Sequence, residues 1–174
     1  VLTGANIPFV IRLRVVLLRD TGAPLAPFNA WQIIQGLETV GLRMKQHCAN
    51  AEKVVTFLET QKKVKNVIYP TNHQGEIKER AKKYLQGGNG ALVGADLGTA
   101  EEGAKFIDNL KMLYHVANIG DARSLAIHPA TTTHSQLNEK ELLAAGVTPG
   151  YVRLSIGIEH PDDIIADIKQ ALAA

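Results

Sequence analysis

The chain has 174 residues, of which 45% are hydrophobic and 21% are charged, and its formal net charge is +2. This composition excludes a disordered chain and fits one soluble globular domain, or one and a half, with a sizeable core. The basic residues are scattered, no apolar run approaches the ~20 residues of a membrane span, and no signal-peptide pattern is present, so we expect a cytoplasmic protein that binds neither nucleic acid nor membrane.

The first third of the chain is predicted to be helical. Residues 7–19 carry apolar side chains at helical spacing and favour a helix, although their β-branched content would also allow a strand. From Pro27 to Glu59 apolar residues recur every three or four positions, which predicts one helix of roughly 33 residues and about 50 Å. Gly36 and Gly41 weaken its first half, so we expect a bend or close packing there. So long a helix typically bridges two domains or two subunits.

The rest of the chain alternates short strands with helices. Strands are predicted within residues 64–69, 91–97, 124–128 and 150–159. Helix starts are indicated by Thr99 with Glu102, Asn138 with Glu141, and Pro161 with Asp162 and Asp163. The predicted fold is α+β, with four short strands backed by helices. Residues 1–60 would form an N-terminal helix and the long linking helix, and residues 61–174 the α+β domain.

The last strand carries the strongest candidate for a binding site. With a period of two, Val152, Leu154, Ile156 and Ile158 point to one face and Arg153 to the other. An arginine held on a strand is a permanently charged, two-pronged donor that suits a carboxylate or phosphate. An isolated strand arginine is more often simply solvated. Residues 118–134 are rich in small polar side chains, as a pocket wall is, although an ordinary turn-rich loop could share that composition.

Other catalytic motifs are weak. Gly88 and Gly90 precede the strand predicted within residues 91–97, which contains Gly94, whereas phosphate-binding glycines follow a strand and open a helix. The six histidines lack zinc-site spacing and only one cysteine could join them, so we predict no metal site. Ser124 lacks the glycine-flanked turn of a hydrolase nucleophile.

Several longer segments follow one another along nearly the whole chain. They include Arg19-Asp-Thr-Gly-Ala, Gln35-Gly-Leu-Glu-Thr, Asn118-Ile-Gly-Asp, His128-Pro-Ala, Thr133-His-Ser-Gln-Leu and Val152-Arg-Leu-Ser-Ile-Gly-Ile-Glu. Together they resemble the C-terminal part of the O-acetylhomoserine sulfhydrylases, which are trans-sulfuration enzymes of Cys/Met metabolism that depend on pyridoxal 5'-phosphate (PLP). The first two segments favour this branch over the cystathionine synthases and lyases.

The resemblance implies the small C-terminal domain of a fold-type I PLP-dependent transferase, which closes over the substrate. Arg153 would pair with the α-carboxylate of the amino-acid substrate. Ser124 would lie beside the cofactor-bearing lysine, Leu125 would continue that wall, and Thr133 would support the carboxylate site from behind. The family's Ser/Thr-x-Thr-Lys context is missing here, and the lysines lie in polar helices or turns. We therefore expect no catalytic residue in this chain, little cofactor binding and no activity of the chain by itself.

For the intact protein, the resemblance implies conversion of O-acetyl-L-homoserine and sulfide to L-homocysteine and acetate by a homotetramer of methionine biosynthesis. Because the chain begins with a valine, we expect it to be a piece of such a protein. The leaving group, acetyl or succinyl, and the sulfur donor stay open at this point. The alternatives are a stand-alone amino-acid-binding module, an oligomerisation module built on the long helix, and a cystathionine synthase or lyase of the same family.

Overall fold

The structure, a computed structural model, describes residues 6–174. The chain divides into two compact units, and the boundary falls between Gly41 and Leu42. None of the helices within residues 6–174 has the length and apolar character needed to cross a membrane.

The first unit contains helices alone within its described residues. Helix α1 (Ile7–Arg12) continues into a π-helical segment, η1 (Leu13–Asp20), and α2 (Pro27–Glu38) follows after a short connection. Asn6 caps α1 by accepting a hydrogen bond from Phe9 N at 3.3 Å. The helix predicted over residues 7–19 is thus confirmed, and the strand alternative is wrong. No described residue of α1, η1 or α2 is buried.

The long helix predicted from Pro27 to Glu59 is divided in two. Helix α2 ends at Glu38, and α3 (Val40–Glu59) begins after Thr39, whose backbone angles of φ −109° and ψ 5° are not helical. The prediction of one continuous rod is therefore corrected. The interruption falls between the two glycines at which a bend was expected. Glycine and β-branched residues are weak helix formers, and no buried contact in α2 offsets their cost.

The second unit is built on a five-stranded sheet of order β1-β2-β5-β4-β3. Its strands are β1 (Asn66–Ile68), β2 (Leu92–Asp96), β3 (Tyr114–His115), β4 (Leu125–Ile127) and β5 (Tyr151–Ser155). All neighbours are antiparallel except β3 and β4, which are parallel. The α+β class and the four predicted strands are confirmed. The fifth strand, β3, was missed because it has two residues, both exposed, and thus no alternating pattern.

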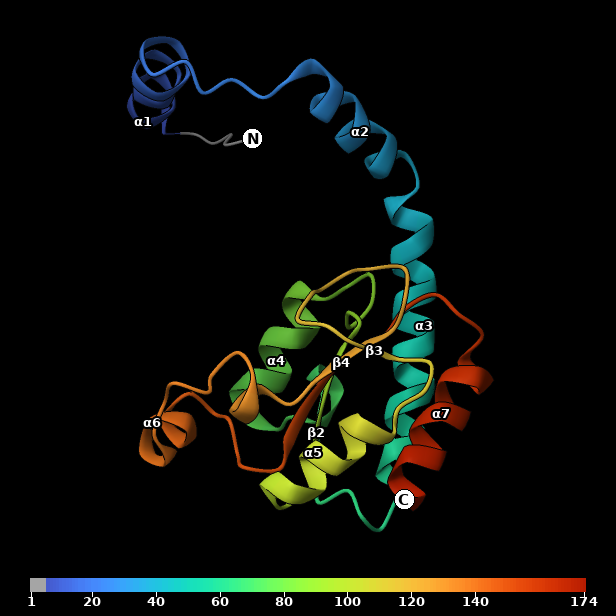
Figure 1. Ribbon diagram of the computed structural model, residues 1–174. Coiled ribbons are helices and arrows are strands. Elements are labelled where there is room, and N and C mark those ends of the chain that lie inside the picture. The colour runs from blue at the N-terminus through green and yellow to red at the C-terminus, as the bar shows by residue number, and fades with distance from the viewer. Residues whose placement is uncertain (1–5) are drawn as a thin grey trace. The chain divides into compact units, whose positions relative to one another are not determined.

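One face of the sheet packs against α3, α5 (Ala100–Asn109) and α7 (Pro161–Ala173), which lie on the same side of the strands in Figure 1. Buried side chains from all of these elements form one core: Val54 and Leu58, Val93 and Ala95, Phe106 and Ile107, Val152 and Leu154, and Ile164 and Ile168. Helix α4 (Gly75–Tyr84), preceded by the turn η2 (Pro70–Asn72), lies on the other face.

The connection from β4 to β5 carries the turn η3 (Pro129–Thr131) and the short helix α6 (Glu139–Ala144). Asn138 begins α6 with the predicted capping box. Thr99 caps α5 by accepting a hydrogen bond from Glu102 N at 3.2 Å.

Most of α3 belongs to the unit of the sheet. Its residues Asn50, Ala51, Val54 and Leu58 are buried there. The predicted division at residue 60 concerns the intact protein and stays a prediction.

Candidate functional site

Arg153 lies in the middle of β5, which is itself the central strand of the sheet. Its backbone is paired with Gly94 of β2 and Ile127 of β4. Its neighbours Val152 and Leu154 are 1% and 0% exposed, in the core. Strand alternation therefore turns the half-buried Arg153 to the face opposite the core, as predicted.

The alternation ends sooner than predicted. Ile156 is fully buried in the core, but Ile158, which was expected on the same face, is 37% exposed. The strand stops at Ser155, and Ile158 N then donates a hydrogen bond of 2.8 Å to Ala122 O in the segment that precedes β4. The packed face of the strand is therefore shorter than the sequence pattern.

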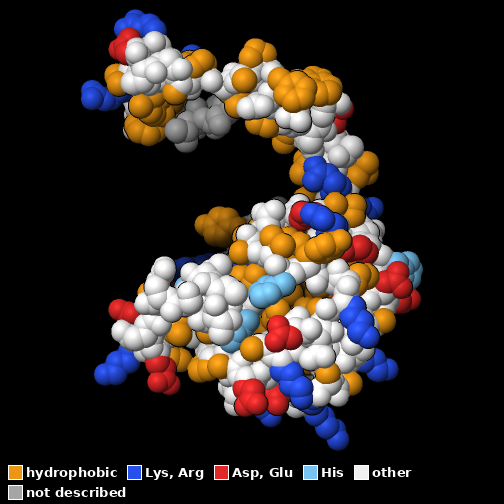
Figure 2. Space-filling view, viewed as in Figure 1, with side chains coloured by type: hydrophobic (Ala, Val, Ile, Leu, Met, Phe, Trp, Pro, Cys, Tyr) orange, Lys and Arg blue, Asp and Glu red, His pale blue; other side chains and the backbone are white. Residues whose placement is uncertain are grey.

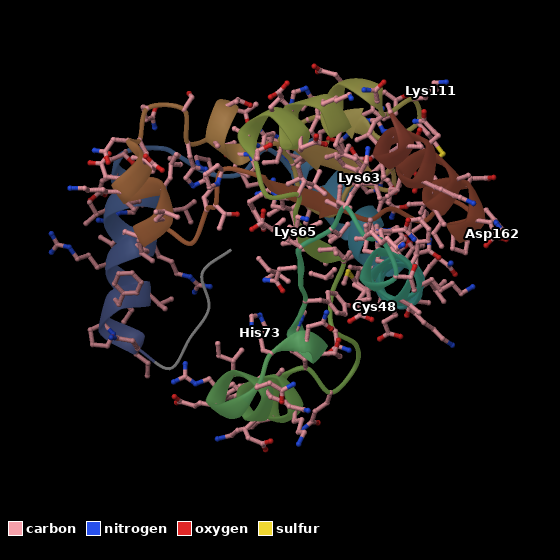
Figure 3. The ribbon with its side chains drawn as sticks, turned by 90° about the horizontal axis from the view of Figure 1, so that it is seen from below. Cys48, Lys63, Lys65, His73, Lys111 and Asp162 are labelled. Carbon is pink, nitrogen blue, oxygen red and sulfur yellow. The ribbon has the colours of Figure 1, made fainter. Side chains whose placement is uncertain are left out.

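A cavity of about 450 Å³ lies between the Arg153 face of the sheet and α4. Its walls include Tyr151 and Arg153 of β5, Leu92 and Gly94 of β2, and Ile77, Arg80, Ala81 and Leu85 of α4. His73, on the turn that leads into α4, also lines it (Figure 3). A mostly apolar cavity with a few polar groups is typical of a site for a small organic ligand.

Tyr151 forms part of this wall because residue 94 is a glycine. A Cβ on Gly94 would lie 2.6 Å from Cε2 of Tyr151 and 2.9 Å from its hydroxyl oxygen, far inside van der Waals contact. Burial raises the pKa of the Tyr151 phenol above its ordinary value, although the charge of Arg153 acts in the opposite direction. The phenol therefore stays protonated near neutral pH, and the cavity wall presents a hydroxyl donor close to the guanidinium.

The guanidinium of Arg153 has little protein bonding of its own. Nη2 donates a hydrogen bond of 3.4 Å to the backbone oxygen of Asn118. Within residues 6–174, no carboxylate forms a salt bridge with it. Because an arginine has five N–H donors, most of them remain for a ligand. Asn118 was not among the predicted site residues, although the small polar segment that contains it had been singled out.

Ser124 and Leu125 lie at the start of β4. The Ser124 hydroxyl is fully buried, accepts a hydrogen bond from Gly157 N at 2.9 Å and donates one to Glu159 Oε2 at 2.9 Å. Its bonding capacity is thus used by the protein. Leu125 is paired with Ser155, two residues from Arg153 and on the same face of the sheet. The structure therefore brings Leu125 toward Arg153, while Ser124 is directed into a polar cluster after β5.

Thr133 lies beyond η3 and is exposed. Its hydroxyl is hydrogen-bonded to Nδ1 of His134 at 2.8 Å. No hydrogen bond links it to Arg153 within the described part of the chain. Its predicted role behind the carboxylate site stays a prediction.

The described residues offer no lysine suited to a Schiff base. Every lysine between residues 6 and 174 is exposed except the half-buried Lys78 of α4. A nucleophilic lysine needs a desolvated amine, which none of these provides. No group of three or more potential metal ligands occurs in residues 6–174 either. The described residues thus offer a donor suited to a carboxylate or phosphate, and no amine suited to the aldehyde of PLP.

Comparison with known proteins supplies the context of this site. Residues 5–173 match the family described as "Cys/Met metabolism PLP-dependent enzyme". The chain is 52% identical to an O-acetyl-L-homoserine sulfhydrylase of Leptospira meyeri, covering 97% of this chain and 39% of that protein. It is 45% identical to O-acetyl-L-homoserine sulfhydrylase 1 of Thermus thermophilus, covering 97% and 40%.

A solved structure shows the same fold. The crystal structure of a putative O-acetylhomoserine (thiol)-lyase of Campylobacter jejuni, with N'-pyridoxyl-lysine-5'-monophosphate in its chain, is 44% identical and has a TM-score of 0.89. The match covers 98% of this chain and 41% of that one. The chain thus spans about two fifths of the length of the relatives it matches.

Proposed function

Because the chain belongs to the Cys/Met metabolism PLP-dependent enzymes, we propose that it is the C-terminal part of an O-acetylhomoserine sulfhydrylase. The intact enzyme would convert O-acetyl-L-homoserine and sulfide to L-homocysteine and acetate in the cytoplasm. The names and the high identity of the relatives support this substrate over a succinyl ester.

The observation that carries the proposal is the position of Arg153. A strand-held guanidinium without a carboxylate partner in the described residues lines a cavity of about 450 Å³. It would bind the α-carboxylate of the substrate through two parallel hydrogen bonds. With both carboxylate oxygens held, the bonds at Cα take one orientation, which is a contribution to rate by positioning.

PLP, when bound through a lysine outside this chain, would supply the electron sink for loss of the α-proton. Leu125 and the backbone of Ser124 would form the wall beside that lysine, and Thr133 would support the carboxylate site. Arg153 would hold the acid end of the substrate and move no proton.

Assembly is part of the proposal. Large apolar side chains of α1, η1 and α2 are exposed, among them Ile7, Phe9, Ile11, Leu17, Phe28, Trp31, Ile34 and Leu37. Residues 1–5 lie outside the described part of the chain. Contiguous apolar surface of this kind marks an interaction site. We propose that the remainder of the enzyme, or another subunit of a homotetramer, covers it.

Kinetics of an Arg153→Lys variant of the full-length enzyme test the carboxylate role. Lysine keeps the charge but loses the two-pronged geometry. We expect KM for O-acetyl-L-homoserine to rise and kcat/KM to fall by about 100-fold, since a misplacement of 1 Å can cost that much. Lys169→Arg, a charge-conserving exchange at an exposed position of α7, is the matched control. Unchanged kinetics of a correctly assembled Arg153→Lys enzyme would refute the role.

A further inference from the structure

A seam of hydrogen bonds joins the segment Asn118–Ser124 to β5 and the four residues after it. The seam consists of Arg153 Nη2 to Asn118 O at 3.4 Å, Gly120 N to Ser155 Oγ at 3.4 Å, Ile158 N to Ala122 O at 2.8 Å, and Gly157 N to Ser124 Oγ at 2.9 Å. The first of these bonds is made by the Arg153 guanidinium that lines the cavity. A movement of the segment would therefore move the acceptor that orients this guanidinium.

Glu159 closes the other end of the seam. Its Oε1 accepts a hydrogen bond from Ser124 N at 2.6 Å, and its Oε2 accepts one from Ser124 Oγ at 2.9 Å. Ser124 is 0% exposed and Glu159 is half-buried, so both bonds are partly shielded from water. Hydrogen bonds to a carboxylate are stronger than those between neutral groups, and two of them to one residue fix its orientation as well as its position.

The two backbones are in direct contact at Gly157. A Cβ there would lie 2.5 Å from Ala122 O and 2.5 Å from Ser124 N, and it would meet the carboxylate of Glu159. At Gly157 no side chain lies between the backbone of residues 122–124 and the backbone after β5, so none can absorb a displacement of one against the other. A shift of Ser124 is therefore passed on to the rest of the segment.

The two sides of the seam are anchored differently outside it. Asn50 of α3 donates hydrogen bonds to Gly157 O at 3.0 Å and Glu159 O at 2.8 Å, and Nδ1 of the buried His47 lies 2.6 Å from Ile156 O. These bonds hold residues 156–159 to the core. In contrast, residues 116–120 are exposed. Outside the seam, Tyr114 N donates a hydrogen bond of 3.1 Å to Ser124 O, and Asn118 N donates one of 3.1 Å to Val116 O. These bonds tie the segment to β3 and not to the core, so the seam supplies its connection to β5.

We propose that Glu159 is a positioning residue of the carboxylate site. It touches neither substrate nor cofactor; it fixes Ser124, and through Ser124 it fixes the backbone of Asn118 against the Arg153 guanidinium. The inference rests on the proposed function, because it concerns the same substrate carboxylate. Ser124 then acts through its bonds to Glu159 and Gly157.

Glu159→Gln in the full-length holoenzyme is the test. Glutamine has almost the same shape but cannot accept from Ser124 N and Ser124 Oγ at once in the present arrangement. We expect KM for O-acetyl-L-homoserine to rise about tenfold with a smaller change in kcat, a milder effect than direct misplacement of the carboxylate ligand. Glu101→Gln, at an exposed position in the first turn of α5, is the matched control.

A double-mutant cycle separates positioning from general stabilisation. If Glu159 acts through Arg153, the combined loss in kcat/KM of Arg153→Lys with Glu159→Gln is smaller than the product of the single losses. Multiplying losses, or a Glu159→Gln enzyme with lower Tm and unchanged KM, would overturn the inference and leave the role of Arg153 intact. An Arg153→Lys enzyme with unchanged kinetics would instead overturn the carboxylate role of Arg153 in the proposed function.

A third variant covers the case in which Glu159→Gln does not assemble. Ser124→Ala removes the hydroxyl but keeps the bond from Ser124 N to Glu159. We expect the same rise in KM at smaller magnitude, about threefold, because part of the anchor remains. An unchanged KM in this variant would count against the inference.

Discussion

Helices α2 and α3 follow one another in the chain and share an apolar periodicity, yet they differ in what covers them. No residue of α2 is buried, whereas α3 buries His47, Asn50, Ala51, Val54, Val55 and Leu58. Trp31 is 56% exposed and Leu58 is 1% exposed. Figure 2 shows the hydrophobic side chains at the surface of the helices before α3. Periodicity therefore tells which residues favour burial, and it does not tell which surface buries them.

The strongest way to break this comparison is to remove one large side chain from each helix. Leu58→Ala leaves a cavity in the core and should lower the free energy of unfolding by about 2–5 kcal/mol. Trp31→Ala in the same 174-residue chain should change it by less than about 0.5 kcal/mol, since exposed positions contribute little. Urea unfolding followed by circular dichroism measures both. Equal effects of the two substitutions would show that α2 is packed after all.

The comparison extends to polar groups. In the sheet unit, the buried carboxylate of Asp167 is hydrogen-bonded by the surrounding backbone. The Asp167 carboxylate of α7 accepts hydrogen bonds from the backbone N–H groups of Lys111, Met112 and Leu113 at 2.9, 2.8 and 3.0 Å. Burial alone would raise the pKa of Asp167, but these bonds and one from Gln170 lower it below its ordinary value. The stability that Asp167 contributes is therefore present above the unfolded-state pKa near 4 and is lost as the pH falls below it.

Asp167→Asn sharpens this point. At pH 7 it should lower the free energy of unfolding by about 1–3 kcal/mol, because three backbone donors lose a charged acceptor. The difference from the parent chain should shrink as the pH falls from about 4, where the unfolded carboxyl becomes protonated, through the lowered pKa of the folded Asp167 carboxylate. Denaturant unfolding at pH 7 and pH 3 measures it. A difference that does not depend on pH would refute the charged role of Asp167.

The smallest expected effect concerns α2, which has no buried residue. A Cβ at Gly36 meets no atom within 4 Å, so Gly36→Ala should add helix propensity of up to about 1 kcal/mol without a clash. The helical signal of the chain at 222 nm should rise slightly while the urea midpoint of the sheet unit stays the same. A shifted midpoint would mean that α2 and the sheet unfold together.

The local pattern of apolar and polar residues predicts much of this fold. The features that it does not predict depend on contacts between residues far apart in the sequence. The alternation around Arg153 set its orientation correctly, because Val152 and Leu154 belong to the core on either side. A bend was expected near Gly36 and Gly41, but the full break at Thr39 was not, since the apolar period continues across it. The pairing of Ser124 with Glu159 spans 35 residues and has no local signal. A serine placed by resemblance beside a cofactor is, in the structure, first bonded to a distant glutamate.

The order of the strands has a consequence for biosynthesis. The last strand in the chain, β5, lies between β2 and β4 in the sheet. While residues 151–155 are still inside the ribosome, β2 and β4 each present an unpaired edge, and long-range pairing of this kind is slow and open to aggregation. The pairing of β5 with both neighbours therefore completes the sheet and positions Arg153 in the same late step of folding. A nascent chain that stalls before β5 would lack both the complete sheet and the positioned arginine.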